Sequence, residues 1–289
     1  MSTLVVRLSS LGDVVLAGSI TAELQPVSFL TSRRYVDIAA ALPGVTEVLA
    51  WEDAPQIRAQ DFQRIIDLHA SMRSRWLTRF MGANRIARHD ITRRLRVAFK
   101  RAPAPPVPNR YAGAAGITPA PLPWLTLPGP TDTLLLVPGA AHPTKQWAPE
   151  RFGELRSRWV KAGGKVCVLG SASEAELCDQ VGGGQAEILA EEGFTQTLKA
   201  IGRGAAAIGG DTGLMHLAAA AGVPSLVLFG PTTAQDGFWT HGGYDISVPL
   251  SCRPCSRHGN AVCPIGDHMC MHSLSVDHVW SALCTVRQP

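Results

Sequence analysis

The sequence predicts an α/β protein made of two Rossmann-like domains, and three observations support this. Short β-branched runs alternate with helical stretches along most of the chain, which is typical of parallel sheets wound with helices. The 289 residues exceed one ordinary domain of about 100–200 residues and fall short of three. Hydrophobic residues make up 46% of the chain and charged residues 17%, so each domain can bury a core.

In the first half, strands are expected at 4–7, 27–31, near Val48 and at 65–68. A tight turn follows the first strand, and a helix over 14–24 with Asp13 as its cap follows the turn. Nine prolines between Pro103 and Pro130 cannot sit inside helices or central strands. We therefore expect irregular chain there, ending in a linker that separates a domain at 1–130 from a domain at 131–289.

The alternation is clearer in the second half. Strands are expected at 134–137, 166–169, 205–208 and 225–229, and helices from Pro149, from Ser173, near Thr195 and over 213–221. Pro149 suits a first helical position, where its missing N–H has no helical partner, and Ser173 with Glu176 fits a capping box. Neither half contains GxGxxG or GxxxxGK[ST], so the usual dinucleotide and P-loop fingerprints are absent.

The charge is unevenly distributed. The formal net charge of +4 is too small to predict a nucleic-acid-binding protein. The segment 73–101 alone holds ten cations and the single acid Asp90, a formal charge of +9. Such a run is either a solvated helix face or a surface that meets an anionic acceptor or membrane.

The N-terminal segment does not read as an export signal. Arg7, a polar break at Ser9 and Ser10, and Asp13 interrupt the apolar core that a signal peptide needs. No apolar run reaches the roughly 20 residues that span a bilayer. We therefore expect a protein with no transmembrane segment that is either cytoplasmic or peripheral on a membrane.

Three loops at strand ends carry residues that fit ligand binding, because ligands of doubly wound sheets bind where strands end. The loop 9–13 places the Asp13 carboxylate at such an end, although Asp13 could simply cap the helix. The loop 138–147 contains glycine, which lets its backbone approach an anion, and Lys145 supplies a mobile cation. An exposed loop lysine often has no specific partner, so this motif alone is only suggestive.

The third loop, 209–216, opens a helix. Thr212 and Gly213 would direct free N–H groups and the positive helix end toward a diphosphate. His216 lies one turn further along on the same face as Thr212, so it can reach the same ligand. The alternative is a capped helix with a buried histidine.

Four cysteines form a further candidate site, and they are Cys252, Cys255, Cys263 and Cys270. Their number and type fit tetrahedral zinc, and four thiolates also hold iron–sulfur clusters. The spacing after the CxxC pair matches neither common template, and buried free thiols are ordinary. Metal binding and reduced packing cysteines therefore both stay open.

Taken together, the motifs resemble glycosyltransferase family 9, the ADP-heptose:lipopolysaccharide heptosyltransferase family. The matching segments are LSSLGDVV at 8–15, IDLHASMRS at 66–74, the 138–147 loop with PERF at 149–152, GDTGLMHL at 210–217, FGPT at 229–232, and the cysteine-rich tail beginning CRPC at 252–255. They occur in order along nearly the whole chain, which is far more specific than any one motif.

The resemblance implies a GT-B fold, in which two Rossmann-like domains face a central cleft, with the acceptor on 1–130 and the nucleotide sugar on 131–289. It implies inverting, metal-independent transfer of a heptose or related sugar from an ADP-sugar. The implied acceptor is the lipopolysaccharide inner core or a related anionic glycolipid at the inner membrane. Catalysis then requires no cofactor, and zinc or iron at the four cysteines would be structural.

The resemblance also implies residue roles. Asp13 matches the general base and Lys145 the cation on the leaving diphosphate. Donor binding is assigned to Ser171, Glu174, Asp211, Thr212, Gly213 and His216, and acceptor binding to Ser10, Gly12 and Arg73. These roles agree with the chemistry, because displacement at an anomeric carbon needs a base for the acceptor hydroxyl and positive charge on the departing diphosphate.

Two other readings remain. One is a GT-B transferase or epimerase that uses a different nucleotide sugar, which nucleotide preference would reveal. The other is a non-catalytic module whose basic segment 73–101 holds anionic lipid, which predicts salt-sensitive membrane binding without affinity for ADP.

Overall fold

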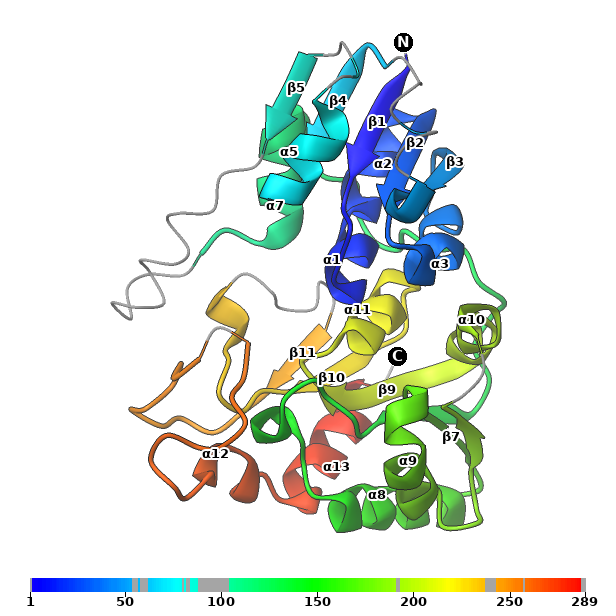
Figure 1. Cartoon of the computed structure of the whole chain (residues 1–289). Coiled ribbons are helices and arrows are strands. Elements are labelled where there is room, and N and C mark those ends of the chain that lie inside the picture. The colour runs from blue at the N-terminus through cyan, green and yellow to red at the C-terminus, as the bar shows by residue number, and fades with distance from the viewer. Residues whose placement is uncertain are drawn as a thin grey trace. The chain divides into compact units, whose positions relative to one another are not determined.

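The computed structural model describes residues 2–53, 57, 62–79, 81, 84–87, 104–190, 193–236, 243–256 and 258–286. The chain divides into two compact units, one formed by Met1–Arg94 with Pro105–Leu125 and the other by Leu95–Ala104 with Thr126–Pro289. Each unit is built on its own parallel sheet with helices (Figure 1). The predicted α/β class with two Rossmann-like sheets is therefore confirmed.

The first unit contains a five-stranded sheet in the order β3-β2-β1-β4-β5. Its strands are β1 Thr3–Val6, β2 Val27–Thr31, β3 Val45–Ala50, β4 Arg64–Asp67 and β5 Asn84–Ala87, and its helices are α1 Leu11–Leu16, α2 Gly18–Leu24, α3 Val36–Ala40, α5 Met72–Thr78 and α7 Val107–Ala115, with 3₁₀ turns at Arg33–Tyr35 and Trp51–Asp53. The strand order reverses at β1, so the carboxyl ends of β1 and β4 form a topological switch point. Ligands of doubly wound sheets bind at such a point.

The prediction that Asp13 caps a helix over 14–24 is wrong. The helix begins at Leu11 with Ser10 as its N-cap residue, and it is interrupted at Ala17 before α2. Ser10 has an extended backbone, and both its N–H and its hydroxyl donate to Oδ2 of Asp13, at 3.3 and 2.9 Å. Asp13 therefore lies inside the first turn, where the positive end of the helix also stabilises a carboxylate.

The proline-rich stretch is not wholly irregular, because α7 lies within it. Pro106 is the N-cap residue, and Pro108 lies in the first turn, where a missing N–H costs no helical hydrogen bond. Val107, Tyr111 and Ala115 are spaced four residues apart and form the buried face. α7 packs against α2 in the first unit.

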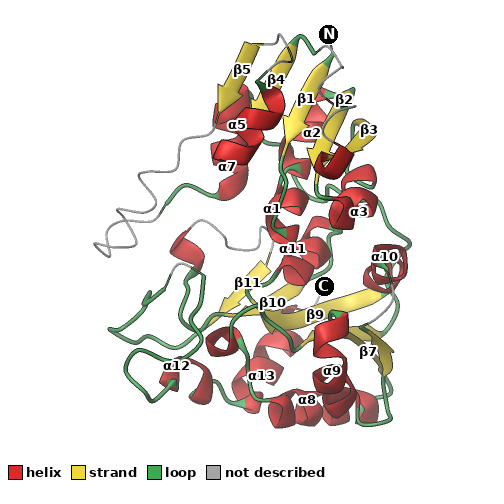
Figure 2. Cartoon of the chain, viewed as in Figure 1, coloured by secondary structure: helices red, strands yellow, loops and turns green. Residues whose placement is uncertain are grey.

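The second unit contains a six-stranded sheet in the order β11-β10-β9-β6-β7-β8. Its strands are β6 Thr133–Val137, β7 Lys165–Leu169, β8 Glu187–Leu189, β9 Gly204–Gly210, β10 Ser225–Leu228 and β11 Gly243–Ile246, and its helices are α8 Pro149–Lys161, α9 Ala175–Gly182, α10 Phe194–Gly202, α11 Gly213–Ala220, α12 Met269–His272 and α13 Val276–Val286, with 3₁₀ turns at Pro143–Lys145, Ala172–Glu174 and Ala234–Asp236. Helices α8 and α13 cover one face of the sheet and α11 lies on the other (Figure 2).

The predicted elements of the second half are present, with one correction. The capping box is formed by Ser171 and Glu174 rather than by Ser173 and Glu176. Oε2 of Glu174 accepts hydrogen bonds from the Ser171 N–H at 2.9 Å and from its hydroxyl at 2.7 Å. The 3₁₀ segment Ala172–Glu174 begins directly after Ser171, so the cap falls two residues earlier than the pattern indicated.

A hydrophobic core joins the second sheet to the C-terminal segment. Trp147 meets Phe152 edge to face with ring centroids 5.1 Å apart, and its indole N–H donates to the Leu274 carbonyl at 2.9 Å. Cys270 and Met271 are buried in the same core. The segment that carries the cysteines is therefore an integral part of the second unit. In the described residues, no helix combines the length and the apolar character needed to cross a bilayer.

Candidate functional site

The switch point of the second sheet lies between β6 and β9. Strands β7 and β8 continue the sheet on one side and β10 and β11 on the other, and Val137 pairs with Gly209 at the carboxyl ends. The chain leaving β6 carries Lys145, and the chain leaving β9 carries Asp211 and opens α11. The structure thus brings together the two loops that the sequence marked as compatible with an anion.

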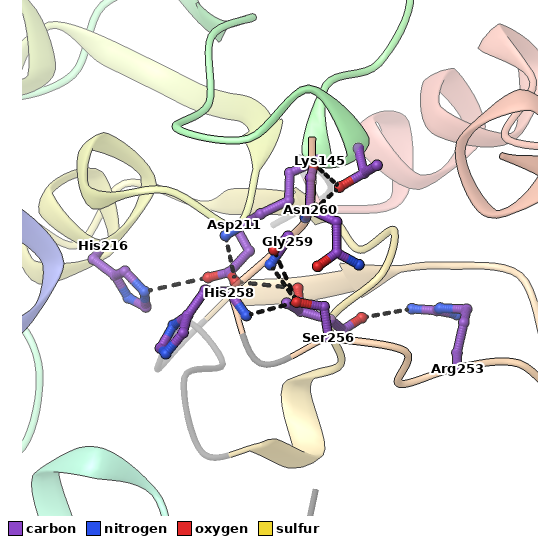
Figure 3. A network of polar contacts seen from close by, with 10 residues as sticks. Lys145, Asp211, His216, Arg253, Ser256, His258, Gly259 and Asn260 are labelled. Atoms are coloured by element: carbon purple, nitrogen blue, oxygen red, sulfur yellow. Dashed lines mark hydrogen bonds and ion pairs between the residues drawn. The ribbon is translucent and has the colours of Figure 1, made fainter. Parts of the chain in front are cut away.

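A nearly buried ion pair joins these loops. Nζ of Lys145 lies 2.8 Å from Oδ2 of Asp211, and the two side chains are only 12% and 11% exposed. The Thr232 hydroxyl donates to the same carboxylate oxygen at 3.2 Å. Nε2 of His216, which is buried, lies 3.6 Å from Oδ1. Figure 3 shows Lys145 and His216 approaching the carboxylate from different directions.

The electrostatics of the pair keep the carboxylate ionised. Burial by itself would raise the pKa of Asp211, but the Lys145 ammonium and His216 outweigh it and hold that pKa well below its usual range. The ammonium of Lys145 is therefore held at a fixed place on the sheet edge by a permanent negative charge.

The start of α11 presents groups suited to an anion. Thr212 is the N-cap residue, with an extended backbone. Its hydroxyl oxygen is buried and has no hydrogen-bond partner in the described part of the chain. Buried polar atoms are normally paired, so this hydroxyl and the free N–H groups of the first turn fit a bound phosphate oxygen.

Ser171 and Glu174 form a second group, beside the loop that follows β6. A methyl group built on Gly139 would lie 2.1 Å from Oε1 of Glu174, so the carboxylate lies directly against this backbone. No described hydrogen bond or ion pair links Glu174 to Lys145 or to Asp211. The loop after β6 therefore contacts Glu174 through Gly139 and Asp211 through Lys145.

In the first unit, Asp13 is buried within a polar network. Arg7 lies 2.6 Å from its Oδ2, and the Tyr111 hydroxyl donates to its Oδ1 at 3.0 Å. Burial would lower the pKa of Arg7, but the Asp13 carboxylate and neighbouring groups raise it above its ordinary value overall. The predicted acceptor residue Ser10 contacts Asp13 directly, and Gly12 is buried in α1 beside it.

Arg7 connects the two strands of the first switch point. Its second terminal nitrogen donates to the Leu68 carbonyl at the end of β4, at 2.7 Å. Directly before that carbonyl, Asp67 accepts the N–H groups of His69 and Ala70 and the hydroxyl of Ser74. Hydrogen bonds from both strand ends therefore fix the chain that leads into α5.

Arg73 lies on α5, where it is exposed and stacked on an aromatic ring. Its guanidinium carbon is 4.7 Å from the ring centroid of Trp51, whose indole N–H donates to the Ser32 hydroxyl at 3.1 Å. Ser32 in turn donates to the Leu8 carbonyl at 2.6 Å. This chain of contacts ties Arg73 to the loop after β1, although no described contact joins it to Asp13.

Only part of the basic run can be placed. Arg73, Arg75 and Arg79 lie on the exposed side of α5 or at its end. Arg85 lies on β5, where the backbone alone is described. The remaining cations, Arg88, Arg93, Arg94, Arg96, Lys100 and Arg101, fall outside the described residues.

The four candidate cysteines line one small cavity of about 20 Å³, together with Arg253. All are free thiols. Burial raises the pKa of Cys255 and of Cys270, whereas a hydrogen bond from the Ile265 backbone lowers the pKa of Cys263. Among the described residues, no group of three or more His, Cys, Asp or Glu side chains is arranged as a finished metal site.

Several residues of these networks escaped the sequence reasoning. Thr232 belongs to a matched motif at the end of β10, the neighbour of β9, and strand order would have placed it near Asp211. Arg7 directly follows β1, so its position also carried a signal. Tyr111 lies 98 residues from Asp13, and no local pattern connects the two.

Known proteins resemble the chain over most of its length. The family profile of glycosyltransferase family 9 (heptosyltransferase) matches residues 121–264. "Lipopolysaccharide heptosyltransferase 1" of Pseudomonas aeruginosa is 26% identical over 310 residues, covering 89% of this chain and 86% of that protein. Among solved structures, the E. coli ADP-heptose lps heptosyltransferase II is 19% identical with a TM-score of 0.79, covering 99% of this chain and 98% of the other.

A second similar structure is the iron-containing dodecameric glycosyltransferase TibC from enterotoxigenic E. coli. It is 14% identical with a TM-score of 0.62, covering 99% of this chain and 75% of that one. The two Rossmann-like sheets therefore form a glycosyltransferase fold of the GT-B type. The comparisons therefore agree with the resemblance to glycosyltransferase family 9 that the motifs indicated.

The buried ion pair leads to a prediction about stability. Asp211→Asn removes the charge that balances Lys145, and breaking a nearly buried pair should lower the free energy of unfolding at pH 7 by about 3 kcal/mol. The folded-state pKa of Asp211 is lowered, so this stabilisation is present above the unfolded pKa of about 3.9 and is lost as the pH falls below it. Urea unfolding from pH 7 to pH 3 measures the difference.

The exposed Asp132 supplies the control, because Asp132→Asn should change stability little at any pH. Equal losses in the two variants, or a wild-type advantage that grows in acid, would contradict the assigned role of the pair.

Proposed function

We propose that this chain is an inverting heptosyltransferase that transfers a heptose or related sugar from an ADP-sugar to the lipopolysaccharide inner core or a related glycolipid. The observation that carries the proposal is that Lys145, Asp211 and the buried Thr212 hydroxyl, which has no hydrogen-bond partner among the described residues, lie at one switch point. The names of the P. aeruginosa and E. coli relatives, which specify lipopolysaccharide and ADP-heptose, support the choice of acceptor and donor.

The donor side supplies positive charge to the leaving group. As the bond between the anomeric carbon and the diphosphate oxygen breaks, the ADP oxygen gains negative charge. Lys145 and the N-terminus of α11 stabilise that charge, with Thr212 and Gly213 donating to phosphate oxygens. Asp211 holds the lysine, His216 lies beside the Asp211 carboxylate on the donor side, and Ser171 and Glu174 bind the nucleoside portion. These groups provide the charge without a catalytic metal.

The acceptor side supplies the base. An acceptor hydroxyl attacks the anomeric carbon from the face opposite the diphosphate, and its proton passes to the Asp13 carboxylate. Attack from the opposite face inverts the configuration at that carbon. Ser10 and Gly12 shape the surroundings of Asp13, and Arg73 binds an anionic group of the acceptor. We assign acceptor binding to residues 1–130 and donor binding to residues 131–289.

The base role predicts a separation between catalysis and donor binding. Asp13→Asn keeps the size of the side chain but removes its basicity, so kcat for sugar transfer should fall by about 10²- to 10⁴-fold. The dissociation constant for ADP should stay unchanged, because the donor groups lie in the other unit. Nucleotide release from ADP-heptose and calorimetric titration with ADP, UDP and GDP measure the two effects.

The titration also tests the donor. Tighter binding of UDP or GDP than of ADP would favour the alternative, a GT-B transferase or epimerase with another nucleotide sugar. An Asp13→Asn enzyme of wild-type activity would exclude Asp13 as the base.

We further propose that the chain acts at the cytoplasmic face of the inner membrane, as a peripheral protein. α5 exposes Met72 by 89% and Trp76 by 54%, one turn apart, with Arg73, Arg75 and Arg79 around them. Apolar side chains surrounded by cations fit the boundary of an anionic bilayer. A non-catalytic lipid-binding module would use the same surface but would need none of the donor groups.

The membrane proposal predicts a loss of vesicle binding. Replacing Met72 and Trp76 together by serine should weaken binding to phosphatidylglycerol vesicles by at least about tenfold, because both apolar side chains are lost. The matched control replaces Val262 and Ile265, which are also exposed at 75% and 60%, and should leave binding unchanged. Co-sedimentation at low and high salt reads out both pairs, and equal binding by all variants would refute the proposal.

We also propose a structural zinc or iron ion at Cys252, Cys255, Cys263 and Cys270. The four thiols line one cavity, sulfur ligands suit both metals, and the similar glycosyltransferase TibC contains iron. The ion would supply structural crosslinking of the segment and no catalytic step.

Elemental analysis should find about one equivalent of zinc or iron in purified protein. The double substitution Cys252→Ser with Cys255→Ser should remove it, whereas Cys284→Ser, at an exposed cysteine outside the cavity, should not. Fully folded protein without metal would rule the ion out.

A further inference from the structure

The backbone of Gly259 packs on the side chain of Lys145. A methyl group built on Gly259 would lie 2.7 Å from Cβ of His142 and 3.0 Å from both Cγ and Cδ of Lys145. Gly259 also has a φ of +100°, which other residues rarely adopt. The aliphatic part of the lysine therefore lies against a backbone that only glycine allows so close.

The residue next to Lys145 is fixed by the same loop. The Asn260 N–H donates to the Thr144 hydroxyl at 2.8 Å, and that hydroxyl donates to the Asn260 carbonyl, also at 2.8 Å. Thr144 is buried, and its carbonyl lies 2.7 Å from Nε2 of His268. The cysteine-rich segment thus holds both Thr144 and Lys145, although it lies more than 100 residues further along the chain.

Ser256 shapes this loop from within. Its hydroxyl oxygen accepts the N–H groups of His258 at 3.2 Å and Gly259 at 2.9 Å, and its proton is donated to the Gly259 carbonyl. Figure 3 shows Gly259 and Asn260 near Lys145, with Ser256 further toward Arg253. The loop that contacts the lysine is therefore defined by its own hydrogen bonds.

We propose that Gly259 and Asn260 are positioning residues for the diphosphate of the donor. A lysine side chain has many rotamers, and ordering them on binding weakens affinity. The backbone of Gly259 restricts the stem of Lys145 before the ligand arrives, while Asp211 orients its ammonium. The inference rests on the proposed function of Lys145 and gives the cysteine-rich segment a role in donor affinity.

Two glycines of the segment allow a matched test. Gly266 has a φ of +85°, close to that of Gly259, but a methyl group there would meet nothing within 4 Å. Gly259→Ala and Gly266→Ala therefore impose similar backbone strain, and only the first displaces Lys145. Gly259→Ala should raise the dissociation constant for ADP by about tenfold or more, and Gly266→Ala should leave it unchanged. Calorimetry measures the affinities, and thermal unfolding checks that both variants are folded.

A double-mutant cycle separates positioning from general damage to the fold. In a Lys145→Ala background, Gly259→Ala should weaken ADP binding no further, because the group that it positions is gone. Additive losses in the cycle, or equal losses in Gly259→Ala and Gly266→Ala, would overturn the proposal. If Lys145→Ala itself leaves ADP binding intact, the proposed function of the lysine fails first and the positioning role falls with it.

A second variant covers the case in which Gly259→Ala does not fold. Thr144→Val keeps the shape of the side chain but removes the hydroxyl that bonds Asn260. It should raise the dissociation constant for ADP by about threefold or more, whereas Thr285→Val, at an exposed helical position, should not. Unchanged affinity in folded Thr144→Val would contradict the role of Asn260.

Discussion

The ion pair between Lys145 and Asp211 is the constraint on which the second unit depends. Two nearly buried charges stabilise a protein only together, because either one alone would be left desolvated and unpaired. The elements around the pair bring the two charges together. Strand β9 delivers the carboxylate, the loop after β6 delivers the ammonium, and Thr232 satisfies a remaining lone pair. A mobile surface lysine is thereby converted into a fixed charge at the edge of the sheet.

The first unit solves a similar problem with different groups. Asp13 is as buried as Asp211, and its partner is the guanidinium of Arg7 rather than an ammonium. The planar guanidinium has a second nitrogen to spare, which donates to the Leu68 carbonyl and ties β1 to β4. Both units therefore place a carboxylate at a switch point with a cation beside it. In the first unit the cation also links the two strand ends.

The sequence predicted those features that depend on neighbours in the chain. The strand that leads to Asp13 and the strand that leads to Asp211 were placed correctly, because alternation and strand-end chemistry are local signals. The helix caps were displaced by two or three residues, since Ser10 and Ser171 compete with nearby polar residues for the same role. α7 was missed because its prolines occupy the few positions where a helix accepts them.

Contacts over long separations could not be predicted from such signals. Tyr111 contacts Asp13 and Asn260 contacts Thr144 across separations of 98 and 116 residues, which only the folded chain brings together. Nothing in the composition of either segment indicates its partner. The cysteine pattern indicated a metal site, whereas the residues that contact Thr144 and Lys145 lie between the cysteines.

The cysteine-rich segment meets the ion pair along two routes. Gly259 packs on the aliphatic part of Lys145, and Arg253 holds the loop that contacts Asp211. The Arg253 guanidinium donates to the carbonyls of Phe229, Gly230, Thr232 and Val248, and so fixes the loop after β10 that carries the Thr232 hydroxyl to Asp211. Arg253 stands between Cys252 and Cys255, so the backbone that carries these thiols also carries the residue that holds this loop. The segment therefore contacts Lys145 directly and Asp211 through the loop that carries Thr232, and it is itself packed into the core of the second unit.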